Sequence, residues 1–100
     1  MLVNNREYVL SKQLLRAATG IGANVEEASA GQTKKDFIAK MSIASKEARE
    51  TRYWLKLLDR SQIVKLDYSI YLKEIDSVIS VLTKIVKTSQ QNIQHLTSNT

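Results

Sequence analysis

Apolar residues recur along this chain at the three- and four-residue spacings of α-helices. In the middle of the sequence, one row takes alternating steps of four and three: Phe37, Met41, Ala44, Ala48, Thr51, Leu55 and Leu58. Such a row is typical of a helix that packs lengthwise against its neighbours. Before it, Thr33 offers a hydroxyl that can cap a helix, and Asp36 a carboxylate that favours the positive helix end. The pattern predicts a helix at about 33–59.

The segments on either side repeat this pattern. A first helix is expected at about 6–29, with its apolar row at Leu10, Leu14, Ala17, Ile21, Val25 and Ala28. A third is expected at about 67–89, with a broader row at Tyr68, Tyr71, Leu72, Ile75, Val78, Ile79, Leu82, Ile85 and Val86. An apolar face half a helix wide is typical of a helix with two or more partners. The polar tail at 90–100 is expected to fray.

The three glycines lie in and just after the first predicted helix. Gly20 and Gly22 form a Gly-x-Gly, but a phosphate-binding loop of that kind needs a preceding strand and a third glycine that opens a helix. We interpret the stretch from Ala17 to Ala23 as a smooth surface for close packing. Gly31 lies between two predicted helices, where a loop glycine can adopt a positive φ at no cost.

Length and composition then set the fold class. One hundred residues, 43% hydrophobic and 25% charged, suit a single domain at 1–100. The absence of proline and the scarcity of glycine leave few helix breakers. We predict an all-α, antiparallel up-and-down helical bundle, whose broad apolar faces favour a homo-oligomer. There is no cysteine, signal peptide or long apolar run, so we expect a cytoplasmic protein that does not contact membranes.

Residues that could bind a metal or act as acids and bases are few. The single histidine, His95, has no acid beside it, so the Glu-x-x-His motif of di-metal bundles cannot form. Glu47 and Glu50 flank the apolar row of the middle helix, and buried carboxylates need partners. We expect them to form structural salt bridges, either with Arg16 or with Arg49 and Arg52.

Two further polar residues lie near the end of the first predicted helix. Asn24 forms helices poorly, which favours a hydrogen-bonding role for it, and Glu27 follows one turn later. We expect both to be structural. No set of residues resembles a nucleophile with its base, so we predict a protein that is not an enzyme and has no cofactor or metal.

Positive charge is concentrated in the middle third of the chain. The net charge is +5, and residues 31–60 carry eight bases and four acids. Seven of the bases populate the outer faces of the middle helix: Lys34, Lys35, Lys40, Lys46, Arg49, Arg52 and Lys56. Tyr53 and Trp54 lie among them and offer rings that can stack on unpaired bases, although Trp54 shares a row with Ile43 and Leu57 and is expected in the core or an interface.

Two functions stay open on these grounds. One is a nucleic-acid or ribonucleoprotein accessory factor that binds RNA or DNA through a basic surface, since a stripe of cations attracts a phosphate backbone. The alternative is a structural scaffold that binds protein and no nucleic acid. Cations that face solvent together favour the first function, whereas cations paired with Asp36, Glu47 or Glu50 favour the second.

Residues 11–58 resemble the four-helix bundle proteins encoded in intervening sequences of large-subunit (23S) ribosomal RNA genes. The matching positions are Gln13, Arg16, Ala17, Ala18, Ile21, Ala23, Asn24, Glu27, Lys34, Lys35, Asp36, Phe37, Ile38, Ser42, Ile43, Ala44, Glu47 and Glu50. The resemblance continues more loosely to about residue 88.

This resemblance implies a homopentameric ring of up-and-down bundles with no known catalysis. The family is similar to the accessory variability determinant protein of diversity-generating retroelements, a pentameric bundle whose basic surface binds nucleic acid and a reverse transcriptase. On that similarity, six side chains chosen for charge and position are candidate nucleic-acid contacts: Arg16, Lys34, Lys35, Lys40, Arg49 and Arg52.

Family members usually begin with a further amphipathic helix, whereas only "MLVN" precedes Asn5 here. We therefore expect a bundle that lacks its first helix or has it truncated. Either the sequence starts late, or the bundle closes with three helices, or another chain supplies the fourth. A three-helix bundle would keep an exposed groove beside 67–89, and such a groove favours aggregation or a partner helix.

Overall fold

The computed structural model of the chain describes residues 5–31 and 33–98, and the side chains of residues 7–31 and 33–94. These residues form three α-helices and no strand: α1 (Asn5–Ser29), α2 (Lys34–Ser61) and α3 (Ser69–Ser98). The prediction of an all-α fold is confirmed. A four-helix bundle and a ring of subunits stay predictions.

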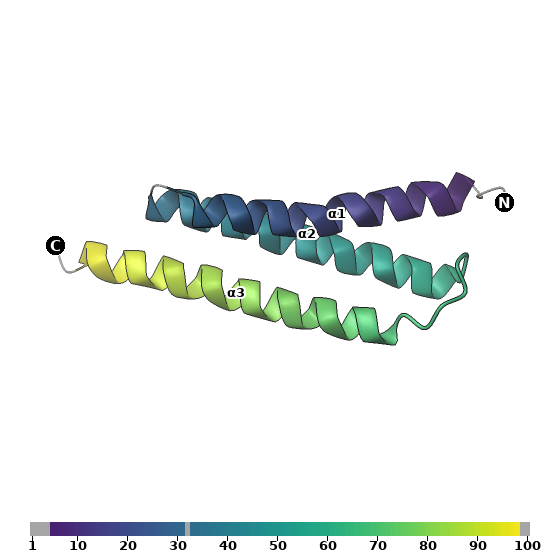
Figure 1. Cartoon of the computed structure of the whole chain (residues 1–100). Coiled ribbons are helices and arrows are strands. Elements are labelled where there is room, and N and C mark those ends of the chain that lie inside the picture. The colour runs from purple at the N-terminus through teal and green to yellow at the C-terminus, as the bar shows by residue number, and fades with distance from the viewer. Residues whose placement is uncertain (1–4, 32, 99–100) are drawn as a thin grey trace.

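The helices lie side by side as three long rods, with α2 in the middle (Figure 1). Helix α2 runs antiparallel to both α1 and α3 and packs against each of them. Within the described residues, no Cα atom of α1 comes within 8 Å of a Cα atom of α3. The molecule is therefore long and flat, with principal extents of 62 × 22 × 14 Å.

The core follows the apolar row of α2. Six of its positions are buried: Met41, Ala44, Ala48, Thr51, Leu55 and Leu58. Helix α1 adds Ala17 and Ala28, and α3 adds Ile75 and Leu82. Tyr68, the residue before α3, is also buried and continues their seven-residue spacing. The broad row predicted for α3 is only partly buried, because Tyr71 and Val78 are exposed on a flank that no described helix covers.

Local hydrogen bonds explain where α2 begins and ends. Thr33 is its N-cap, and the Thr33 hydroxyl accepts from the Asp36 amide at 3.1 Å, as predicted. At the other end Gln62 takes the left-handed conformation, with φ 50°, and its amide donates to the Leu58 carbonyl at 2.9 Å. Gly31, for which we expected a positive φ, does not have one. A Cβ atom there would lie 3.1 Å from the Ala28 carbonyl oxygen, so limited space favours glycine at this turn.

Two groups just before α3 have shifted pKa values. The Asp67 carboxylate accepts from the Ser69 amide at 3.0 Å, and hydrogen bonds from the side chain and then the backbone of Ser69 lower the pKa of Asp67. The buried Tyr68 hydroxyl donates to the Val64 carbonyl at 2.9 Å. Burial, followed by the negative charges of Asp59 and Glu7, raises the pKa of Tyr68.

Helix α3 is longer than the sequence pattern predicts. We expected residues 90–100 to fray, yet the helix continues to Ser98, and residues 99–100 lie outside the described residues. Ser89 is buried and Ile93 half-buried, so the inner face of the helix extends past the predicted end. No proline or glycine interrupts this segment. Among the described helices, none is long and apolar enough to cross a membrane.

The small residues of α1 do not form one packing surface. Ala17 is fully buried, and a Cβ atom on Gly20 would lie 3.2 Å from Glu47 of α2. Gly22, by contrast, is exposed, and a Cβ atom there would have no neighbour within 4 Å. Ala18 and Ala23 are exposed as well. The packing surface expected from Ala17 to Ala23 is thus limited to the side of the helix that faces α2.

Candidate nucleic-acid interface

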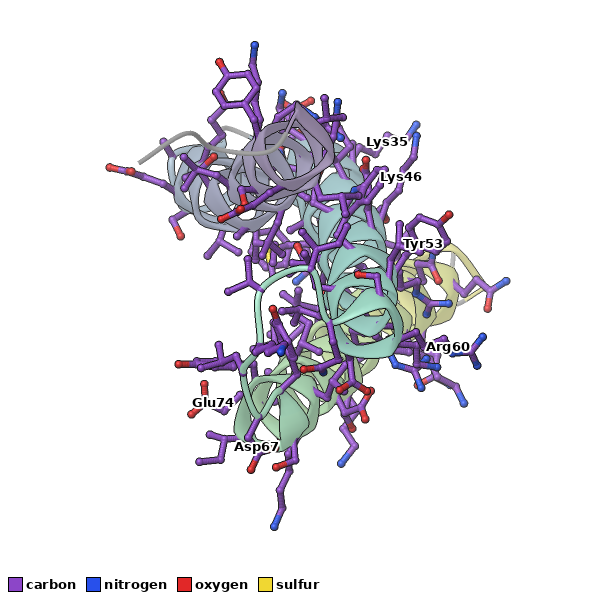
Figure 2. The ribbon with its side chains drawn as sticks, turned by 90° about the vertical axis from the view of Figure 1, so that its right-hand side faces the viewer. Lys35, Lys46, Tyr53, Arg60, Asp67 and Glu74 are labelled. Carbon is purple, nitrogen blue, oxygen red and sulfur yellow. The ribbon has the colours of Figure 1, made fainter. Side chains whose placement is uncertain are left out.

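The outer face of α2 carries five cations on one side of the helix. Seven positions form this face, at a first step of seven residues and then at steps of four and three: Lys35, Ser42, Lys46, Arg49, Tyr53, Lys56 and Arg60. All seven are exposed. Figure 2, which looks along the helices, shows Lys35, Lys46, Tyr53 and Arg60 on the same side of the molecule. At 1.5 Å per residue, the row from Lys35 to Arg60 is about 37 Å long. We call these seven positions the cationic face.

The cationic face contains no acid, because the four acids of α2 lie elsewhere on the helix. Asp36 belongs to the first turn, and Asp59 is half-buried near the other end. Glu47 and Glu50 point toward α1. Within the described residues, none of the five cations of this face forms a salt bridge. Their charge is therefore not neutralised by the protein itself.

Arg16 of α1 forms salt bridges with Glu47 and Glu50 of α2. Its guanidinium contacts Glu47 Oε2 at 3.8 Å and donates from Nη2 to Glu50 Oε1. The Arg16 Nε atom also donates to the Gln13 side chain at 3.2 Å. Of the two partners that the sequence left open for these carboxylates, Arg16 is thus the one found. This candidate contact is neutralised and joins α1 to α2.

Two more of the six candidates are paired. Lys40 Nζ lies 2.8 Å from Glu27 Oε2 of α1, and Arg52 Nε lies 2.9 Å from Asp76 Oδ1 of α3. Since pairs that are partly exposed contribute only about 0 to 1 kcal/mol each, these contacts mainly fix the positions of the helices. The prediction that Glu27 has a structural role agrees with its pairing to Lys40.

The remaining three candidates are in different places. Lys34 begins α2 and is exposed, and Lys35 lies on the cationic face. Arg49 reaches across to α3, where its Nη2 atom lies 3.4 Å from the Thr83 hydroxyl oxygen. The structure therefore does not bring the six candidates together on one surface. It separates Arg16, Lys40 and Arg52, which have acidic partners, from Lys34, Lys35 and Arg49, which have none among the described residues.

Two cations of this region were not singled out from the sequence. Arg60 lies on the cationic face seven residues, or about two helical turns, after Tyr53. The predicted helix ends at about residue 59 and therefore does not include it. Lys87 belongs to α3, and only the packing of α3 against α2 places it beside Lys46 and Arg49 in a shared groove.

The two neighbouring aromatic residues of α2 lie in different surroundings, Tyr53 in solvent and Trp54 near the contact with α1. The Tyr53 side chain is 58% exposed and meets Trp54 edge to face, with ring centroids 5.0 Å apart. Trp54 is half-buried, and its indole nitrogen lies 3.4 Å from Glu50 Oε1. Trp54 therefore supports the glutamate pair, and Tyr53 alone offers its ring on the cationic face.

The other polar residues have local roles. The Asn24 amide donates to the Gly20 carbonyl at 2.8 Å, one turn earlier in α1. In the described part of the chain, no three His, Asp or Glu side chains gather as metal ligands would. The side chain of His95 lies outside the described residues.

Comparisons with known proteins agree with this helical architecture. The family model described as 23S rRNA-intervening sequence protein matches residues 2–84. The chain is also similar to a crystal structure of a protein with unknown function from the S23 ribosomal protein family of Bacteroides thetaiotaomicron. The two chains share 42% sequence identity and a TM-score of 0.77, over 84% of this chain and 79% of that chain. No curated protein matches the sequence. The resemblance inferred from residues 11–58 is thereby confirmed, and the chain belongs to the 23S rRNA-intervening sequence protein family.

Proposed function

We propose that this protein is a non-enzymatic, self-associating accessory factor of the cytoplasm that binds RNA or DNA through the cationic face of α2. The observation that carries the proposal is the row of five unpaired cations with no acid among them. A protein cation strengthens binding when it neutralises a phosphate and so displaces condensed counterions from the nucleic acid. A cation that already pairs with a carboxylate is less available for this, so the unpaired cations matter most for binding.

The size of this effect follows from the number of contacts. Each phosphate contact adds about 0.7 to the salt slope of log K for a single strand and about 0.9 for a duplex. If all five cations make contact, the slope is at most about −3.5 to −4.5 per subunit. Repetition of the face around an oligomer would raise the affinity through multivalency without any new kind of contact.

Self-association is supported by apolar side chains on the opposite flank. In α3, four apolar residues near Glu74 are exposed, at four and three positions before it and four and seven positions after it: Ile70, Tyr71, Val78 and Val81. Glu74 lies on the side of the molecule away from Lys46 and Arg60 (Figure 2). Large exposed apolar surfaces mark interaction sites. The proposal assigns this flank to contacts between subunits, in a homopentamer such as the family resemblance implies, and leaves the cationic face open.

The test compares two triple variants that remove the same charge. The first, Lys46→Gln/Lys56→Gln/Arg60→Gln, removes three cations from the cationic face. The matched control, Lys65→Gln/Lys73→Gln/Lys84→Gln, removes three exposed lysines from outside that face. Fluorescence anisotropy with a structured RNA, at about 50 and 200 mM salt, gives the affinity and its salt slope. Multi-angle light scattering gives the subunit number.

We expect the first triple variant to lose up to about 2 to 3 units of salt slope and the control to lose little. Equal losses in both variants would mean that only net charge matters, and the cationic face would not be the binding site. A wild-type oligomer that ignores RNA at both salt concentrations would favour the alternative function, a structural scaffold that binds protein through its apolar flank.

A further inference from the structure

A groove between α2 and α3 has the chemistry of a phosphate site. Its volume is about 370 Å³, and it borders the cationic face, with which it shares Ser42, Lys46 and Arg49. Helix α3 adds Thr83 and Lys87 on the opposite wall. Three cations and several hydroxyl donors thus line one groove, and there is no carboxylate among the described residues that line it.

Arg49 is the central residue of this groove. It contacts the Thr83 hydroxyl, a neutral partner, at 3.4 Å. This contact directs the guanidinium across the groove without neutralising it. Arg16 and Arg52, by comparison, both have carboxylate partners. A guanidinium with free N–H groups matches the oxygens of a phosphate in a bidentate manner, which a lysine ammonium cannot do.

Acids that could compete for Arg49 are held elsewhere. On α2, Glu47 and Glu50 point toward α1 and pair with Arg16. On α3, Asp76 lies seven positions before Thr83, about 10.5 Å along the helix, and pairs with Arg52. The ion pairs on both sides of α2 therefore keep negative charge away from the groove.

We propose that this groove binds a backbone phosphate of the nucleic acid, with Arg49 as the bidentate donor and Lys46 and Lys87 as flanking charges. The hydroxyls of Ser42 and Thr83 donate to the remaining phosphate oxygens. The inference rests on the proposed function, because the phosphate belongs to the bound nucleic acid. The cationic face attracts a nucleic acid through its overall positive charge, and the groove adds one contact of fixed geometry. Such phosphate contacts set the register of a strand on a protein surface.

The experiment keeps the charge and changes only its geometry. Arg49→Lys retains the cation but removes the bidentate donor, and Arg52→Lys is the matched control at an arginine that pairs with Asp76 and lies outside the cationic face. We expect Arg49→Lys to weaken RNA binding about tenfold, which is about 1.4 kcal/mol and the order of one lost hydrogen bond to a charged group. The salt slope should stay unchanged. Arg52→Lys should bind as the wild type does, because a lysine at this position keeps the charge that pairs with Asp76.

The possible failures can be told apart. If the wild type does not bind RNA at low salt, the proposed function fails, and this inference fails with it. If the wild type binds and the triple variant of the cationic face loses its slope, while Arg49→Lys binds as tightly as Arg52→Lys, only the groove inference is overturned. Helical circular dichroism and denaturant midpoints confirm that both arginine variants are folded.

A second measurement identifies the source of the phosphate. Amide chemical shifts of Ser42, Arg49 and Thr83 are followed during titration with a short RNA, with an uncharged oligomer of the same bases, and with inorganic phosphate. We expect the RNA to shift these amides and the uncharged oligomer to leave them unchanged. Shifts that saturate at lower concentration with inorganic phosphate than with RNA would overturn the assignment to a backbone phosphate.

Discussion

Gly20 and Gly22 of α1 provide a matched pair of positions in the same turn of helix. Replacing a helix-interior glycine with alanine gains about 1 kcal/mol when nothing obstructs the new methyl group. At Gly22 a Cβ atom would have no neighbour within 4 Å. At Gly20 it would meet the Cγ, Cδ and Oε2 atoms of Glu47, each at 3.2 Å, which is closer than ordinary van der Waals contact.

The sign of the Gly20→Ala effect depends on how freely Glu47 can move. The Glu47 side chain is only 17% exposed, and its carboxylate contacts Arg16 at 3.8 Å. Forcing a methyl group into such a packed site costs about 1 to 3 kcal/mol. Taking about 2 kcal/mol for this cost against about 1 kcal/mol of helix propensity, Gly20→Ala should destabilise the protein by about 1 kcal/mol. Gly22→Ala should stabilise it by about 1 kcal/mol.

Urea unfolding followed by helical circular dichroism, at one fixed protein concentration, measures both variants. The concentration is fixed because subunit association contributes to the apparent stability. A double-mutant cycle isolates the cause: in a Glu47→Ala background, Gly20→Ala should become stabilising by about 1 kcal/mol. If Gly20→Ala stabilises the otherwise unmodified chain as much as Gly22→Ala does, this would refute the reasoning, because Glu47 would then yield without cost.

Three further predictions concern other contacts. Thr33→Ala should lower the free energy of unfolding by about 1 kcal/mol, measured by urea unfolding, because the Asp36 amide loses its cap. The raised pKa of Tyr68 favours the protonated phenol in the folded state, so its contribution to stability should be lost as the pH rises above about 10. Tyr68→Phe should remove this part of the alkaline destabilisation, and unfolding curves between neutral and alkaline pH would show it. Glu47 Oε2 is buried and has no hydrogen-bond donor among the described residues, and its salt-bridge partner is Arg16. Arg16→Ala should therefore destabilise the protein by about 1 to 3 kcal/mol, because it removes the cation from a buried carboxylate oxygen. An unchanged urea midpoint would contradict the role given to this arginine.

The helices could be predicted from the sequence because their signals are local. The row from Phe37 to Leu58 marks the inner face of α2, and the Thr33 cap fixes its start. What covers the broad apolar face of α3 could not be predicted for the opposite reason. Whether Tyr71 and Val78 are buried depends on what covers that flank, and periodicity does not contain that information.

The candidate site was predicted only in part, because pairing between helices decides which cations are free. Arg16 and Arg49 are both exposed arginines in the sequence pattern. Arg16 meets Glu50 of α2, whereas Arg49 meets the neutral Thr83 of α3. In each pair the two residues are 34 positions apart in the chain. Only the packing of the helices against α2 distinguishes these two arginines.

The central place of α2 also affects how the protein folds. Among the described residues, helix contacts join only neighbours along the chain, α1 with α2 and α2 with α3, so each requires the closure of one short loop. Such a low contact order is typical of helical proteins that fold in roughly microseconds to milliseconds. Since α1 and α3 do not depend on each other, the two helical hairpins can form in either order. Opening of α3 would leave the α1–α2 hairpin intact, and hydrogen exchange should then resolve two units of different stability that share α2.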